Sequence, residues 1–210
     1  MRFLTGLVLM VCMGMVQASE LKGVGLFQTL DNPWFLVALY GEKERTADKE
    51  PAEARLPEKL QLKVVEDKIS IRRYRQLWQD VFAVSQERDV WAAHGDDLQS
   101  FFQLVKGPLE QNDLLVIERK DGATVVSLNY REHARLSESF LDVLVTTLTG
   151  RISAIPELRD GLNGTLPEDE QRRLLRQFDK GEPTLGRISE TGRWLRRQPS
   201  VVTEARISQL

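Results

Sequence analysis

An Asp-Gly pair between two apolar runs constrains the fold of this chain more than any other local feature. Residues Leu114 to Glu118 precede Asp121-Gly122, and residues Thr124 to Leu128 follow it. Asp and Gly both tolerate the positive φ that a tight turn needs, so this pattern predicts a β-hairpin. The two strands of a hairpin are antiparallel neighbours, so the fold must contain an antiparallel sheet.

Two further strands are predicted before this hairpin. The run WFLVALY at residues 34–40 is rich in aromatic and branched side chains and follows the turn signal Asp31-Asn32-Pro33, which is typical of a buried strand. Leu60, Leu62 and Val64 then alternate with polar residues, which is the period of a half-buried strand. The charged, proline-containing segment between them, from Gly41 to Pro57, is predicted to be a loop.

Apolar residues at spacings of three and four predict four amphipathic helices. We expect these helices to begin at Ser70, at Asp96 or Asp97, at Ser137 or Ser139, and at Glu168. Ser70 is the predicted N-cap of the first, Gly150 is the predicted C-cap of the third, and Thr165 with Glu168 has the spacing of a capping box for the fourth. Strands and helices do not alternate regularly, which favours an α+β fold with an antiparallel sheet backed by helices.

Residues 1–18 are predicted to be a cleavable signal peptide. Arg2 precedes an uncharged run, and Val16-Gln17-Ala18 before Ser19 is the small-residue pattern that a signal peptidase accepts. We therefore expect a periplasmic protein that begins at Ser19. Cys12 and all four methionines lie in this segment, so the mature chain has no thiol for a disulfide, a nucleophile or a metal ligand.

The mature chain is predicted to form one domain, residues 19–182, followed by a polar, arginine-rich tail at 183–210 with a short helix around Trp194. The full chain has 29 basic and 31 acidic residues, so no polyanionic partner is indicated and we expect no nucleic-acid binding. No second apolar segment is long enough to span a membrane. The sequence identifies no protein partner.

Few residues offer catalytic or metal-binding chemistry. His94 and His133 have no partner at a ligand spacing and are predicted to lie at the surface. No serine elbow or phosphate-binding loop is present, and we expect no metal and no cofactor. What remains is hydroxyl groups within apolar helical stripes, chiefly Tyr74 and Thr147. These groups either contact a ligand or hydrogen-bond within the core, and the spacing of the residues favours the second alternative.

Several segments together resemble the bacterial chalcone isomerase-like family. They are Gly23-Val24-Gly25 with residues 34–40, LQLKVVEDKISIRRYRQLW at 60–78, DLLVIERKDGATVVSLN at 113–129, SFLDVLVTTLTG at 139–150 and PELRDGLNG at 156–164. The resemblance covers roughly residues 21–178. It implies an open-faced β-sandwich, in which a large antiparallel sheet carries a layer of helices with a ligand cleft between them.

In plant members of this family the cleft uses an arginine, a tyrosine, an asparagine and a threonine, and fatty-acid-binding members hold a carboxylate with an arginine and a tyrosine. The resemblance places the tyrosine at Tyr74 and the threonine at Thr147, but the asparagine position is Val81. The arginine belongs near residues 23–40, which contain none. A buried anion without a cation is costly, so chalcone isomerase activity is not expected.

We therefore expect an exported, non-catalytic protein that binds a small apolar or amphipathic ligand, such as a fatty acid, through Tyr74 and Thr147. Two alternatives remain open. One is an isomerase or lyase acting on an unknown substrate, and the other is a protein-interaction module that uses the arginine-rich tail.

Overall fold

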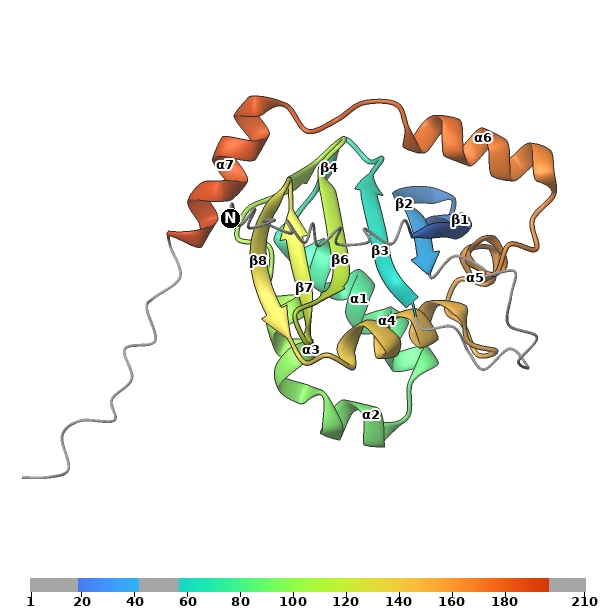
Figure 1. Cartoon of the computed structure of the whole chain (residues 1–210), viewed down its shortest axis with the longest axis horizontal. Coiled ribbons are helices and arrows are strands. Elements are labelled where there is room, and N and C mark those ends of the chain that lie inside the picture. Colours follow the sequence, from blue (N-terminus) through green and yellow to red (C-terminus); the bar gives the residue numbers. More distant parts are fainter. Residues whose placement is uncertain (1–18, 42–56, 197–210) are drawn as a thin grey trace, which may run out of the picture.

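The computed structural model describes residues 19–41 and 57–196. The predicted signal peptide and most of the predicted loop at 41–57 lie outside these residues. The described chain forms a mixed domain in which helices flank a twisted sheet (Figure 1).

The main sheet has six strands, and every neighbouring pair is antiparallel. In spatial order the strands are β1 (Glu20–Thr29), β2 (Asn32–Gly41), β3 (Pro57–Val64), β6 (Leu114–Lys120), β7 (Ala123–Leu128) and β8 (Arg131–Leu136). A separate short pair joins β4 (Lys68–Ile69) to β5 (Leu109–Glu110). The predicted α+β class with an open antiparallel sheet is confirmed.

The hairpin predicted at Asp121-Gly122 is the β6–β7 connection. Asp121 has φ 51° and Gly122 has φ 69°, which are the left-handed values that a two-residue hairpin turn requires. A similar turn at Leu30 and Asp31, with φ 50° and 60°, joins β1 to β2. Strand β1 therefore pairs with β2 along its whole length, although the sequence analysis identified only its Gly23-Val24-Gly25 segment.

One face of the sheet is covered by α1 (Ile71–Ser85), α3 (Gly95–Phe102) and α4 (Phe140–Thr149), with the short α2 (Arg88–Ala93) at the periphery. The large buried core lies between these helices and the sheet. The core-facing side chains alternate along each strand, as the period of two predicts. Examples from the sheet are Phe27, Phe35, Val37, Leu60, Leu62, Leu115 and Ile117.

The predicted helix caps are only partly observed. Ser70 is the N-cap of α1, and its hydroxyl accepts a hydrogen bond from the Arg73 backbone N–H at 3.2 Å. Gly150 is the C-cap of α4 but has extended backbone, with φ −65°, rather than the left-handed conformation of a glycine cap. The predicted capping box at Thr165 is wrong. Its hydroxyl donates instead to the Asp160 carbonyl at 3.0 Å, and α6 (Glu168–Phe178) begins after Pro167.

Two glycine-containing segments meet where α5 (Pro156–Leu162) crosses β1. A Cβ atom on Gly23 would lie 2.3 Å from the Leu162 carbonyl oxygen, and one on Gly161 would lie 2.5 Å from the Val24 carbonyl oxygen. Only glycine permits this approach of the helix backbone to the strand. The contact brings these two motifs, which are distant in sequence, together in the fold.

The opposite face of the sheet is covered in part by α6. This helix contributes Leu174 and Phe178 to a second, smaller apolar cluster, whose other buried members are Val24, Leu36, Ala38 and Leu114. In Figure 1, α6 and α7 (Leu185–Leu195) lie beyond the sheet from α1 and α4, joined by one extended connection.

The short helix predicted around Trp194 is observed as α7, and it packs on the domain. Its Trp194 is 3% exposed and belongs to the main core. Residues 183–210 are predicted to be a polar tail that follows the domain, and in the described part of this segment α7 packs on the domain. Among the described helices, none has the length and apolar character needed to cross a membrane.

Candidate functional site

Tyr74 lies on the buried face of α1, between the helical layer and the sheet. Its side chain is fully buried, and its hydroxyl donates a hydrogen bond to the Phe101 carbonyl oxygen at 3.3 Å. The ring contacts those of Trp78 and Phe101. Burial raises the pKa of Tyr74 far above its ordinary value, so the phenol stays neutral and can act as a hydrogen-bond donor but not as a base near neutral pH.

Thr147 lies on α4 and is also fully buried. Its hydroxyl donates to the Val143 carbonyl oxygen at 2.6 Å, one turn earlier in the same helix, and accepts a hydrogen bond from the Gln86 side-chain amide at 2.8 Å. This threonine therefore joins α4 to the C-cap residue of α1.

The structure places Tyr74 and Thr147 at opposite ends of α1. Tyr74 is in the first turn of that helix, whereas Thr147 contacts Gln86, which is twelve residues later. At a rise of about 1.5 Å per residue, the two positions are separated by roughly 18 Å along the helix axis. The two hydroxyls do not converge on one point, so no single small polar group contacts both.

Two polar atoms on α1, which the sequence pattern did not indicate, are buried without a hydrogen-bond partner among the described residues. They are the indole Nε1 of Trp78 and the hydroxyl of Ser85. The spacing of seven residues puts them on one face of the helix. A buried polar group without a partner costs free energy, which calls for a water molecule or a ligand beside each. The sequence does not reveal the unpartnered N–H of Trp78, because a tryptophan in an apolar stripe is also an ordinary core residue.

Trp78 is the centre of an aromatic cluster that fills the space between α1 and the sheet. Its ring centroid lies 5.6 Å from Phe27, in a stacked arrangement, and 5.0 Å from Phe101, edge to face. Phe35 and Tyr74 complete the cluster at 6.5 Å each. All five side chains are fully buried, so any molecule entering this layer must displace aromatic rings.

No basic side chain of the described chain is buried within this cluster. The nearest cations of α1 lie at its rim, where Arg73 stacks over Trp34 at 5.0 Å and Arg75 donates to the Phe102 carbonyl oxygen at 3.2 Å. Val81, at the family's asparagine position, is buried among apolar residues. The departures from the chalcone isomerase pattern that the sequence indicated thus persist in the folded domain.

The buried charges lie elsewhere, at the attachments of α6 and α7. Lys63 on β3 donates to the carbonyl oxygens of Phe178 and Gly181, the latter at 2.8 Å, and its ammonium lies 4.9 Å from the centre of the Phe178 ring. Burial lowers the pKa of Lys63, and the charges of Asp179 and Glu182 oppose that shift. This lysine fastens the end of α6 to the sheet.

Arg187 of α7 makes a bidentate ion pair with the fully buried Asp113. Its Nη2 lies 2.6 Å from Oδ2 of Asp113, and its Nε lies 3.1 Å from Oδ1. Burial acts to lower the pKa of Arg187, but the hydrogen bond and charge of Asp113, with Glu110 and Glu190, raise it above its ordinary value. Asn129 donates to the same carboxylate at 2.8 Å, so the ion pair belongs to a fully bonded network.

His133 is buried, which corrects the prediction that both histidines lie at the surface. It is 7% exposed on β8, and its ring meets Trp194 edge to face at 6.3 Å. Its Nε2 has no hydrogen-bond partner among the described residues, and burial lowers its pKa to about 4. The cause is tertiary, since α7 covers this end of the strand. His94 is half-buried, with Nδ1 3.7 Å from an Asp97 oxygen.

The described residues contain no cluster of three or more histidine, cysteine or carboxylate side chains able to hold a metal ion. The side chains around Tyr74 therefore provide hydrogen bonding and apolar contact.

The domain has the chalcone isomerase-like fold, as comparison with solved structures shows. The crystal structure of a fatty-acid binding protein from Arabidopsis thaliana matches it with a TM-score of 0.51 and 18% sequence identity, over 70% of this chain and 88% of the plant chain. No protein-family model and no curated protein matches the sequence. At this identity the match defines the fold.

Proposed function

We propose that this protein binds an amphipathic molecule with a long acyl chain, such as a fatty acid, between α1 and the sheet, and that it catalyses no reaction there. The observation that carries the proposal is the pair of unpartnered polar atoms, Trp78 Nε1 and Ser85 Oγ, on the buried face of α1. The fold is also that of a plant protein described as a fatty-acid binding protein.

The geometry of the layer favours an elongated ligand. Tyr74 lies in the first turn of α1, Trp78 lies at its middle, and Ser85 lies beside Gln86, the partner of Thr147, at its C-terminal end. A long acyl chain can extend along the helix between these polar groups once the aromatic rings that fill the layer have moved. We propose Tyr74 as a contact near the first end and Thr147 as a contact near the second.

The absence of catalysis is proposed from the chemistry of the side chains in this layer. Tyr74 is a neutral phenol whose pKa is raised by burial, and its neighbours are hydrocarbon and indole rings. General acid–base catalysis needs a group whose pKa lies near the working pH, and this layer offers none among the described residues. A catalytic role for the protein, the alternative left open by the sequence, has no comparable support.

Trp78→Phe is the variant that tests the binding site. It removes the unpartnered N–H and keeps an aromatic ring. The full-length mature protein, freed of lipid, is titrated with palmitate and with naringenin by calorimetry. We expect saturable palmitate binding that weakens by roughly two- to tenfold in Trp78→Phe, the value of one neutral hydrogen bond.

Trp34→Phe provides a matched control, because the Trp34 indole already donates to the Thr29 hydroxyl at 2.7 Å. This variant should retain wild-type affinity for palmitate.

The association rate constant of palmitate should be lower than that of a ligand entering an open pocket, because aromatic rings must move first. Stopped-flow tryptophan fluorescence measures this rate constant. The proposal fails if the wild-type protein binds no palmitate, or if Trp34→Phe and Trp78→Phe reduce the affinity equally.

We also propose that the protein works in the periplasm after cleavage of residues 1–18. The support is the signal-peptide pattern of the sequence. N-terminal sequencing of protein isolated from the periplasmic fraction should begin at Ser19 or within a few residues of it. Recovery of a chain that retains Met1 in the membrane fraction would contradict the proposal.

A further inference from the structure

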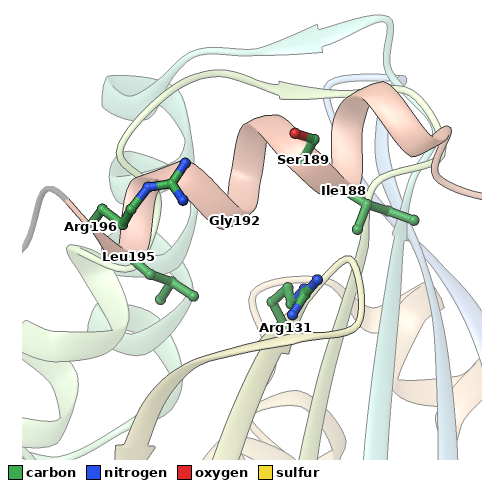
Figure 2. Close-up of a pocket in the computed structure, with 6 residues that line it drawn as sticks. All are labelled: Arg131, Ile188, Ser189, Gly192, Leu195 and Arg196. Atoms are coloured by element: carbon green, nitrogen blue, oxygen red, sulfur yellow. The ribbon is translucent and has the colours of Figure 1, made fainter.

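A separate cavity lies at the other side of the domain, between α7 and the beginning of β8. Its volume is about 240 Å³, and Figure 2 shows the residues that line it: Arg131, Ile188, Ser189, Gly192, Leu195 and Arg196. None of these residues belongs to the aromatic cluster around Trp78. The cavity is therefore distinct from the layer beneath α1.

Two arginines give this cavity an uncompensated positive charge. Within the described residues, no ion pair or hydrogen bond joins the guanidinium of Arg131 or Arg196 to a carboxylate. Two acidic residues on the same elements have other partners, since Glu132 pairs with Arg135 at 3.2 Å and Glu190 pairs with Arg187 at 2.8 Å, and the charge of Glu182 acts on Tyr130. The end of α7 contributes only about half a negative charge through its macrodipole, so the two guanidiniums dominate. The cavity attracts an anion.

The apolar part of the cavity comes from α7. Figure 2 shows Ile188 and Leu195 directed from the helix toward Arg131. Between them Gly192 has no side chain, and a Cβ built there would meet no atom within 4 Å. Glycine inside a helix is unfavourable by about 0.5–1 kcal/mol relative to alanine, so its presence at this open position calls for a reason beyond helix formation.

The walls of the cavity are held in place from both ends of α7. Arg187 is bound to the buried Asp113, and Trp194 is buried against the core. Residues 188–192 lie between these two anchors, so the helix keeps its distance from β8. These anchors fix the backbone of α7 beside the cavity, so on binding the ordering cost falls mainly on the exposed side chains of Arg131 and Arg196.

The volume limits the size of a ligand. The cavity is open to solvent on one side, and its volume of about 240 Å³ leaves room for a short ligand of roughly ten non-hydrogen atoms. We propose that this cavity binds a short-chain monocarboxylate, with the carboxylate on Arg131 and Arg196 and the hydrocarbon between Ile188 and Leu195. Arginine suits the role because its planar guanidinium matches a carboxylate in a bidentate arrangement.

Hexanoate is the probe for this site, with hexanol as the neutral analogue and hexylamine as the cationic one. Binding to the full-length mature protein is followed by ¹⁵N chemical-shift titration. Hexanoate should shift amides of α7 and β8, its affinity should fall as sodium chloride is added, and hexanol and hexylamine should bind at least tenfold more weakly.

Three variants test whether hexanoate binds within the cavity itself. Arg131→Gln removes one charge and should weaken hexanoate at least tenfold. Gly192→Leu places a side chain in the cavity and should abolish binding while leaving the folded spectrum unchanged, because its Cβ enters open space. Arg193→Gln is the matched control, since this arginine is exposed on the same helix but does not line the cavity.

The result that supports the proposal is loss of hexanoate binding in Arg131→Gln and Gly192→Leu with retention in Arg193→Gln. Equal binding of hexanol, equal loss in all three variants, or shifts confined to α1 around Trp78 would each overturn it. Trp78→Phe should leave hexanoate binding at α7 intact, so failure of this site and failure of the acyl-chain site are distinguishable.

Discussion

The two faces of the sheet are covered by different physical means. The face beneath α1, α3 and α4 is joined to its helices by a large cluster of aromatic and aliphatic side chains. The other side carries a smaller apolar cluster under α6, and the buried polar groups Lys63, Asp113 and Arg187 add oriented bonds to α6 and α7, while Trp194 of α7 also packs in the main core. Apolar packing beneath α1, α3 and α4 does not depend on the direction of individual contacts. The hydrogen bonds and ion pairs at α6 and α7 do depend on it.

This difference predicts where single substitutions have large effects. In the apolar layer, the loss of unfolding free energy on truncation depends on the volume removed and on how far neighbouring side chains relax into the cavity. In the polar attachments the cost depends on whether a buried charge keeps its partner. Four sets of substitutions test the comparison, in order of decreasing effect on stability.

Arg187→Met should lower the free energy of unfolding most, by about 3–5 kcal/mol, because it leaves the Asp113 carboxylate buried without its cation. Urea unfolding measures the change. Arg193→Met, on the exposed face of the same helix, should change the free energy by less than about 0.5 kcal/mol. Similar effects of the two changes would show that the ion pair does not hold α7.

Leu144→Ala should lower the free energy of unfolding by about 2–5 kcal/mol, because this side chain is fully buried in the α4 stripe that faces the sheet. Leu185→Ala is the matched control, since this leucine is 85% exposed. The same urea titration compares them. A negligible shift of the midpoint in Leu144→Ala would mean that α4 does not carry the main core.

His133 should make stability depend on pH. Its pKa is lowered to about 4 in the folded protein, so between the ordinary value of 6.5 and about 4 the unfolded chain binds more protons than the folded one. Stability from this residue is complete above pH 6.5 and is lost as the pH falls. At about 1.4 kcal/mol per pKa unit, the loss by pH 4 is about 2–3 kcal/mol.

His133→Phe keeps an aromatic ring against Trp194 and removes the titration, so its free energy of unfolding should fall less than that of the wild type between pH 6.5 and 4. Leu185→Ala, which changes no titratable group, is the control and should retain the wild-type slope. Chemical unfolding at several pH values measures both. Parallel curves for wild type and His133→Phe would contradict the assignment of the slope to His133.

Tyr74→Phe and Thr147→Val should have the smallest effect on stability, about 0.5–1.5 kcal/mol each, because each removes one neutral hydrogen bond. Thermal unfolding without ligand measures this. Loss of palmitate affinity in either variant would support its proposed contact with the ligand. Lower melting temperature with unchanged affinity would assign that hydroxyl to the fold alone.

Much of the fold followed from local pattern. The hairpin at Asp121-Gly122, the Ser70 cap and the apolar stripes of α1 and α4 are features in which neighbouring residues decide the backbone conformation. The apolar character of the layer around Tyr74 also followed, because the helical stripes that form it are hydrocarbon.

What local pattern did not reveal depends on residues brought together from distant parts of the chain. Asp113 and Arg187 are 74 positions apart, and nothing near either one in sequence indicates that they meet. The same holds for the burial of His133 beneath Trp194 and for the cavity lined by Arg131 and Arg196. Residues 185–195 resemble a polar tail in sequence because only contacts with distant residues, such as Asp113 for Arg187 and the main core for Trp194, show that α7 packs on the domain.

Turn chemistry and hydrophobic period were enough to predict the antiparallel sheet, its principal helices and the apolar character of the layer beneath α1. The folded domain was needed to show that Tyr74 and Thr147 lie at opposite ends of one helix, that Trp78 and Ser85 are buried without partners among the described residues, and that α7 closes a charged cavity. The reason is physical, since hydrogen-bond satisfaction and uncompensated charge depend on which groups meet in space.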